Sequence, residues 1–136
     1  MKKVFGKLPS GETAHLYTIT SGTITAAVTD FGGNLVSLWV PDKDGNLADV
    51  VLGYDSIRDY ETQTEYLGAT VGRFAGPIPQ GKLQVGECIY QLTQNGDDGN
   101  NMHGGFVGFS FRVWESEVLP DGVRFSLFSP DGEEGF

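Results

Sequence analysis

The chain has 136 residues, which is enough for one domain but not for a second core of ordinary size. Its formal net charge of −9 argues against nucleic acid or an anionic membrane surface as partners, because both attract basic patches. No stretch has the pattern of a signal peptide or the apolar length of about 18 residues that a membrane helix needs. We therefore expect a soluble, cytoplasmic protein.

The only cysteine, Cys88, cannot form an internal disulfide, which also favours a reducing compartment. It lies in an apolar, strand-like run. A small buried hydrophobic side chain is a commoner role in such a run than a nucleophile, so we expect Cys88 to be buried.

Short strands joined by tight turns are indicated by the many glycines and prolines between β-branched and aromatic runs. The expected strands cover residues 13–20, 23–29, 34–40, 48–54, 82–85, 88–92, 111–118 and 122–128. Turn signals separate them at intervals of roughly eight to twelve residues, which is typical of an antiparallel β-sandwich or part of one. We expect an all-β fold and a single domain over residues 1–136.

Two segments between the strands carry local signals. Residues 41–46 contain three oxygen-bearing side chains but lack the glycine and glutamate positions of a calcium loop, so a solvated hairpin loop is the better interpretation. Residues 56–60 begin with the Ser-x-x-Asp pattern of a capping box and predict one short helix, the only one expected.

The apolar stretch 66–74 contains a single charge, Arg73, and glycines that divide it into bent pieces. For this arginine we favour a buried structural salt bridge over a contact to a ligand. Residues 76–81 follow, where two prolines exclude a central strand.

Residues 100–109 place His103 beside the glycine pair Gly104-Gly105. Glycines without side chains allow a ligand or a neighbouring strand to approach the backbone closely. From chemistry alone, a structural histidine is the more common outcome, and binding or proton transfer is the alternative.

Four stretches and the end of the chain together resemble one known family, and their order and spacing make the match specific. They are residues 30–35, 48–54, 68–81, 101–109 and 129–136. The chain resembles the N-terminal part of the aldose 1-epimerases, or galactose mutarotases. This resemblance implies a galactose mutarotase-like β-sandwich that is incomplete at its C-terminal side.

The reaction implied by the resemblance is the exchange of α and β anomers of a free aldose such as glucose or galactose, without a metal or other cofactor. A base removes the proton of the anomeric hydroxyl and an acid protonates the ring oxygen. In the family these are a glutamate and a histidine that lie downstream of the segment matched by residues 133–136. We therefore expect this chain to hold no catalytic residue and to be inactive alone.

The sugar contacts implied by the resemblance are led by His103, which aligns with the histidine of the family's Leu-His-Gly-Gly motif. Asn101 in the same motif and Arg73 complete the expected substrate-binding set, although we expect Arg73 to be mainly structural. The family's Asn-Arg pair is replaced here by Gly76 and Pro77, which removes an arginine donor.

Two other functions stay open. One is a non-catalytic carbohydrate-binding module, in which exposed rings stack on sugar faces; the candidate rings are Tyr66, Phe74, Phe106 and Phe109. The other is a self-associating half-sandwich, whose uncovered edges pair with a second copy or with a complementing C-terminal chain.

Overall fold

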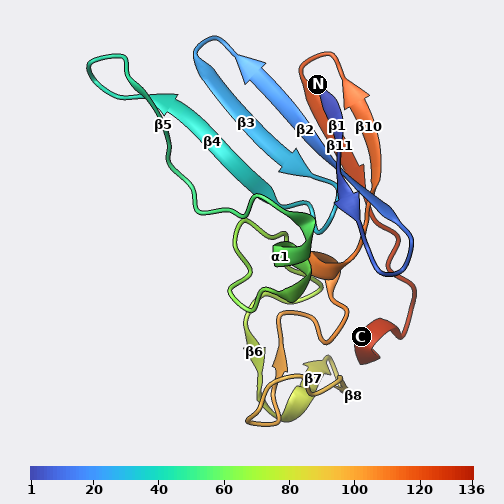
Figure 1. Ribbon diagram of the computed structural model, residues 1–136. Coiled ribbons are helices and arrows are strands. Elements are labelled where there is room, and N and C mark those ends of the chain that lie inside the picture. The colour runs from blue at the N-terminus through green and yellow to red at the C-terminus, as the bar shows by residue number, and fades with distance from the viewer.

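A computed structural model describes all residues from 1 to 136 and shows a protein made mainly of antiparallel strands (Figure 1). The largest sheet has five strands that follow one another in chain order. They are β1 (Lys2–Lys7), β2 (Thr13–Ser21), β3 (Ile24–Thr29), β4 (Leu35–Pro41) and β5 (Leu47–Asp49). The predicted strands at 13–20, 23–29 and 34–40 are confirmed.

A hairpin forms the second layer on this sheet. It consists of β10 (Glu115–Leu119) and β11 (Gly122–Ser126), which pair antiparallel. Tyr17 of β2 joins the layers, because its ring lies 5.4 Å from that of Phe125 and its hydroxyl lies 2.6 Å from the Ser116 hydroxyl. The predicted fold class, an antiparallel β-sandwich that is only partly built, is confirmed.

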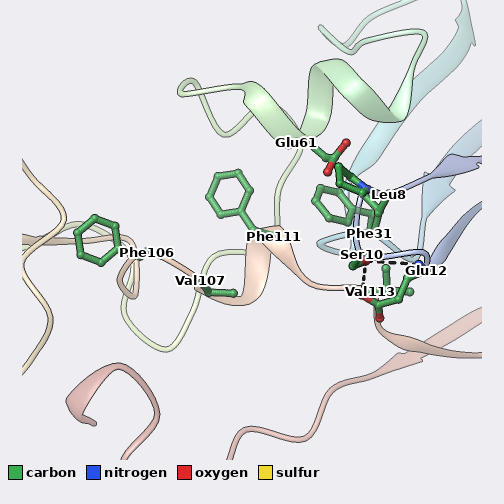
Figure 2. Close-up of a pocket in the computed structure, with 10 residues that line it drawn as sticks. Leu8, Ser10, Glu12, Phe31, Glu61, Phe106, Val107, Phe111 and Val113 are labelled. Carbon is green, nitrogen blue, oxygen red and sulfur yellow. Dashed lines mark hydrogen bonds between the residues drawn. The ribbon is translucent and has the colours of Figure 1, made fainter.

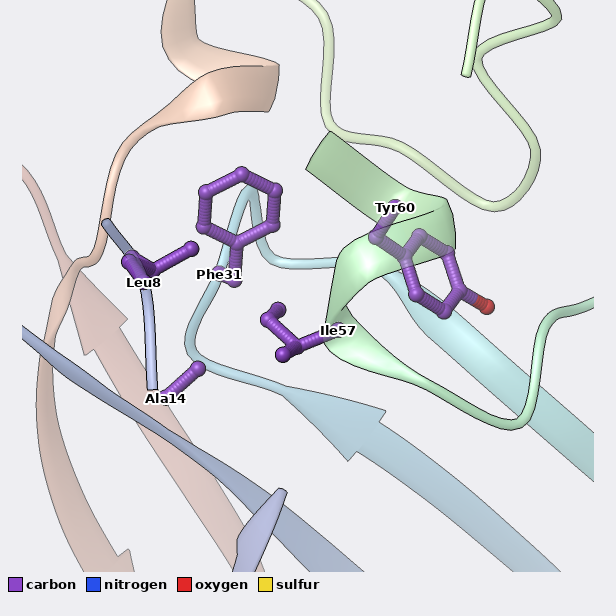
Figure 3. Packing of buried hydrophobic residues seen from close by; sticks show 5 residues of the cluster. All are labelled: Leu8, Ala14, Phe31, Ile57 and Tyr60. Carbon is purple, nitrogen blue, oxygen red and sulfur yellow. The ribbon is translucent and has the colours of Figure 1, made fainter. Parts of the chain in front are cut away.

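The main apolar core lies at one end of the sheet, where α1 (Ile57–Thr62) covers it (Figures 1 and 3). Its five buried members are Leu8, Ala14, Phe31, Ile57 and Tyr60. The Tyr60 hydroxyl also accepts the backbone N–H of Tyr54 at 3.2 Å, so the buried phenol has a hydrogen-bond partner. This small core fixes the helix against the sheet and leaves many apolar side chains elsewhere exposed.

The N-terminus of α1 is capped as the sequence predicts. The Ser56 hydroxyl accepts the backbone N–H of Asp59 at 3.3 Å and donates to its carboxylate at 2.7 Å. We expect Ser56→Ala to lower the free energy of unfolding by about 1 kcal/mol, because the substitution removes the cap acceptor. Urea denaturation measures this loss. Ser21→Ala, at an exposed strand end, is the control, and an equal loss in both variants would contradict the capping role.

The structure differs from the predicted strands at three places. β1 was not predicted, because its lysines and glycine hide the alternation. β5 ends at Asp49, whose carboxylate accepts the N–H groups of Leu38 at 2.9 Å and Val51 at 3.2 Å and so takes the place of ladder acceptors. β10 begins only at Glu115: of the predicted strand 111–118, Phe111 lies in the 3₁₀ helix η2 (Phe109–Phe111), and residues 112–114 pair with residues 30–32 through an isolated bridge between Phe31 and Val113.

A separate hairpin corrects the prediction for Cys88. The strands β7 (Lys82–Val85) and β8 (Cys88–Gln91) pair only with each other, and every residue of β8 is exposed. Cys88 is an exposed free thiol instead of a buried side chain. The apolar pattern was read correctly as a strand, but no second layer covers it.

The remaining elements surround the histidine loop. β6 (Pro77–Ile78) pairs with β9 (Asn101–Met102), and the 3₁₀ helices η1 (Pro79–Gly81) and η3 (Glu133–Gly135) lie in the adjoining segments. β6 is only two residues long, in agreement with the prediction that its prolines exclude a central strand. None of the helices has the length and apolar character required to span a membrane.

Candidate functional site

The β6–β9 pair brings His103 against the backbone of Gly76. The His103 N–H donates to the Gly76 carbonyl at 3.2 Å, and the Gly76 N–H donates to Nδ1 of His103 at 3.1 Å. A backbone N–H can only donate, so the neutral imidazole carries its proton on Nε2. The half-buried ring therefore presents an N–H donor on its other edge.

Tyr66 forms one wall of this position. Its ring centroid lies 4.5 Å from that of His103, and on another side it packs edge-on against Phe111 at 5.5 Å. Burial raises the pKa of the Tyr66 phenol above its usual value. His103 thus lies between a peptide group and an aromatic ring, which restricts the orientation of the imidazole.

The glycine pair after His103 is required by close packing. A Cβ on Gly104 would lie 1.8 Å from the Gly72 carbonyl oxygen, and a Cβ on Gly105 would lie 2.2 Å from Oε2 of Glu134. Both glycines also have positive φ, +91° and +102°. The sequence left open whether a ligand or a neighbouring part of the chain approaches these glycines. At both positions it is a neighbouring part of the chain.

The prediction for Arg73 as a buried salt bridge is wrong. Arg73 is exposed and has no carboxylate partner. Its Nε donates to the Ser129 hydroxyl at 2.8 Å, and a terminal nitrogen donates to the carbonyls of Ser129 at 3.1 Å and Pro130 at 2.5 Å. Phe136 lies under the guanidinium at 5.9 Å. Arg73 thus fastens the C-terminal segment to the site.

Arg73→Lys is expected to loosen this segment. A lysine keeps the charge but loses the planar set of donors that reaches three acceptors, so we expect a loss of about 1 kcal/mol in the free energy of unfolding. Hydrogen exchange at the Phe136 amide should become faster. Arg124→Lys, at an exposed ion pair with Glu117, is the control; unchanged exchange at Phe136 in Arg73→Lys would contradict the fastening role.

Asn101 is completely buried, and its Nδ2 donates to the Thr93 carbonyl at 2.8 Å. Its Oδ1 has no hydrogen-bond partner. Each of the three predicted sugar contacts therefore has a different partner: Gly76 for His103, Thr93 for Asn101, and the 129–130 segment for Arg73. His103 keeps Nε2 without a hydrogen bond to the protein, and Asn101 keeps its buried Oδ1 without one.

Glu134 of η3 was missed as a part of the site, and its neighbour Glu133 makes its bonds outside the histidine loop. Glu133 binds Arg112 and the Ser129 hydroxyl, and Glu134 binds the backbone after the histidine loop. In the sequence these residues appear only as charges in a turn-like segment. Their place beside a glycine pair 29 residues earlier depends on the fold.

A separate groove of about 410 Å³ opens near the loop (Figure 2). Phe31, Phe111 and Val113 line it, Phe106 and Val107 lie toward one end, and the polar side chains of its lining are Ser10, Glu12 and Glu61. His103 does not line it. None of the three expected sugar contacts lines this groove, so we keep the candidate site at the histidine loop. No group of three or more His, Cys, Asp or Glu side chains is arranged to hold a metal ion.

Residues 15–136 match the family model described as aldose 1-epimerase. The chain belongs to the aldose 1-epimerase family. Among its relatives are a protein named galactose mutarotase from Mus musculus, 39% identical over 136 residues, and one named aldose 1-epimerase from Escherichia coli (strain K12), 33% identical over 131 residues. These alignments cover 99% and 94% of this chain but 40% and 37% of the relatives.

Solved structures agree with this assignment. A GalM/aldose epimerase homologue from C. elegans superimposes with a TM-score of 0.81 at 31% identity, and covers 90% of this chain and 38% of its own. A galactose 1-epimerase from Lactobacillus acidophilus NCFM gives a TM-score of 0.80 at 28% identity. The resemblance predicted from the sequence is confirmed, and the chain spans about 40% of the length of the first curated relatives.

Proposed function

We propose that these residues form the sugar-recognition part of an aldose 1-epimerase site, and that His103 contacts a hydroxyl of the free aldose. The observation that carries the proposal is the hydrogen bond from the Gly76 N–H to Nδ1 of His103. It leaves Nε2–H as a fixed donor for a sugar oxygen. The side wall formed by Tyr66 offers an aromatic surface beside that donor.

We further propose that this chain binds aldose without accelerating anomer exchange. That reaction needs one group to accept a proton and another to donate one at the opposite side of the ring. The loop offers a single imidazole, and the second histidine, His15, is bonded to Asp30 on the sheet. Pro77 stands where the family resemblance leads us to expect an arginine donor. Anomer exchange itself is therefore assigned to a site with further groups.

Two NMR measurements test this proposal. Saturation-transfer difference spectra should show transfer from the protein to D-galactose or D-glucose, and none to the corresponding alditol, which has no ring. The α to β conversion of freshly dissolved α-D-glucose should proceed at the buffer rate. Absence of transfer to any aldose would contradict sugar recognition. Acceleration that His103→Ala abolishes would contradict the binding-only assignment.

A non-catalytic carbohydrate-binding role is supported by two exposed rings, Phe74 and Phe106. Phe109, in contrast, is half-buried: its ring packs edge-on against Trp114 at 6.1 Å and lies against Gly72. Calorimetric titration separates the two roles: tighter binding of oligosaccharides than of monosaccharides would favour the module, because a longer chain can cover both exposed rings.

Self-association is supported by apolar side chains that the fold leaves uncovered, among them Trp39 at 43% and Leu52 at 78% exposure. We propose a homo-oligomer that covers them; a complementing chain supplying the acid and the base is the other proposed partner. An average mass that rises with concentration in sedimentation velocity is expected, and a monomer at every concentration would contradict self-association.

The exposed thiol of Cys88 supports the proposed cytoplasmic location, because exposed thiols persist in reducing compartments.

A further inference from the structure

We infer that Glu134 is the positioning residue of the sugar site: its carboxylate holds the backbone that follows His103, and so keeps Nε2 of the imidazole directed toward the aldose. This inference rests on the proposed function, because it names a residue that acts on the proposed sugar contact through the loop. Glu134 itself is not placed against the sugar.

The first support is the number of donors that converge on this carboxylate. Oε1 accepts the N–H of Val107 at 2.8 Å, and Oε2 accepts the N–H of Phe106 at 3.3 Å and the hydroxyl of Thr93. An ionised carboxylate accepts hydrogen bonds and donates none, and charge-assisted hydrogen bonds are stronger than neutral ones. Two consecutive backbone donors are therefore held by one charge.

The second support is the fit between this carboxylate and Gly105. A Cβ at Gly105 would lie 2.2 Å from Oε2 of Glu134 and 2.6 Å from the Thr93 hydroxyl. The carboxylate thus occupies the space above the glycine that any other residue would fill. The glycine pair and the glutamate, 29 residues apart, form one packed unit with the His103 turn.

The third support is that both ends of Glu134 are anchored. Its own carbonyl accepts the Thr93 N–H at 2.9 Å, next to the bond that its carboxylate accepts from the Thr93 hydroxyl. The carboxylate that binds the loop is therefore itself held in place. On the opposite limb of the loop, Asn95 donates to the carbonyls of Met102 at 2.9 Å and Gly105 at 3.0 Å.

These contacts leave His103 between two held segments. Residues 101–102 are fixed by β9 and Asn95, and residues 106–107 are fixed by Glu134. His103 has a φ of +53°, a left-handed conformation that is uncommon for residues other than glycine and costs energy. If the Glu134 carboxylate no longer holds residues 106–107, we expect the backbone at His103 to change conformation. The hydrogen bond from the Gly76 N–H to Nδ1 of His103 should then weaken.

E134Q tests the inference, and E133Q is its matched control. Glutamine keeps the size of the side chain but replaces one acceptor oxygen with an NH₂ group that cannot accept from Phe106 or Val107. E133Q removes the neighbouring charge, which binds Arg112 and does not touch the loop. The readouts are the imidazole tautomer of His103 from ¹H–¹⁵N spectra of the side chain, and the Kd for D-galactose.

In E134Q we expect the Nε2–H signature of His103 to become a mixture of tautomers, and the Kd for D-galactose to rise about tenfold, as for loss of one charge-assisted hydrogen bond. In E133Q both readouts should remain near those of the unmodified chain. If E134Q does not fold, E134D is measured instead. It keeps the charge, but its shorter side chain cannot reach both N–H groups, so a smaller change in the same direction is expected.

An unchanged tautomer signature in a folded E134Q, or equal changes in E133Q and E134Q, would overturn the inference. The tautomer readout needs no sugar. If the unmodified chain binds no aldose, the proposed function fails while the tautomer still decides whether Glu134 positions His103. If the chain binds aldose and E134Q behaves normally, only the positioning role is lost.

Discussion

Replacement of His103 by alanine is expected to weaken aldose binding by at least about tenfold, since it removes a donor to the sugar worth more than 1 kcal/mol. The substitution also leaves the Gly76 N–H without its partner, Nδ1, on the part-buried inner side of the loop. Isothermal titration with D-galactose measures the change in Kd.

The chain supplies its own control in the second histidine. The imidazole of His15 is bonded to Asp30 at 3.0 Å, on a strand of the main sheet. His15→Ala should lower stability but leave the Kd of the folded protein unchanged. Equal Kd values in His103→Ala and the unmodified chain would show that sugar is bound elsewhere.

The substitution Gly104→Ala is expected to cost roughly 3 kcal/mol or more in the free energy of unfolding, as the sum of backbone strain and overpacking. The added methyl would meet the Gly72 carbonyl oxygen at 1.8 Å, and backbone atoms cannot move aside as a flexible side chain does. Urea denaturation measures the loss, and binding should be lost with it because the loop can no longer pack on residue 72.

Gly86→Ala separates the two contributions. Gly86 has a φ of +61°, but a Cβ there would meet nothing within 4 Å. Its substitution should cost about 1–2 kcal/mol, the penalty for a left-handed conformation alone. If Gly104→Ala were no more destabilising than Gly86→Ala, the close approach of residue 72 to the loop would be contradicted.

The sequence predicted well those parts of the fold that depend on neighbouring residues. The alternation in β2, β3 and β4 and the capping box at Ser56 are local patterns, and the structure confirms them. The exposure of Cys88 was not predictable in this way. An apolar strand shows that a covering layer would be favourable, but whether one is present depends on the rest of the fold.

In the site, too, the sequence predicted what depends on neighbouring residues and missed what depends on distant ones. The glycine-rich turn at His103 was recognisable, whereas the partners of Arg73 lie 56 and 57 residues away and those of the Glu134 carboxylate lie 27 to 41 residues away. A single sequence carries no signal for such pairings. Family resemblance identified the right segments, but it could not say that Arg73 would bind Ser129 and Pro130.

A titration of the ¹⁵N-labelled chain with D-galactose, followed by NMR, tests the central claim most directly. Sugar recognition at the histidine loop predicts saturable shifts that include the Gly76 amide and the His103 side chain, with the β7–β8 hairpin unaffected. Saturable shifts confined to the main sheet, or none at all, would contradict the assignment of the sugar site to His103.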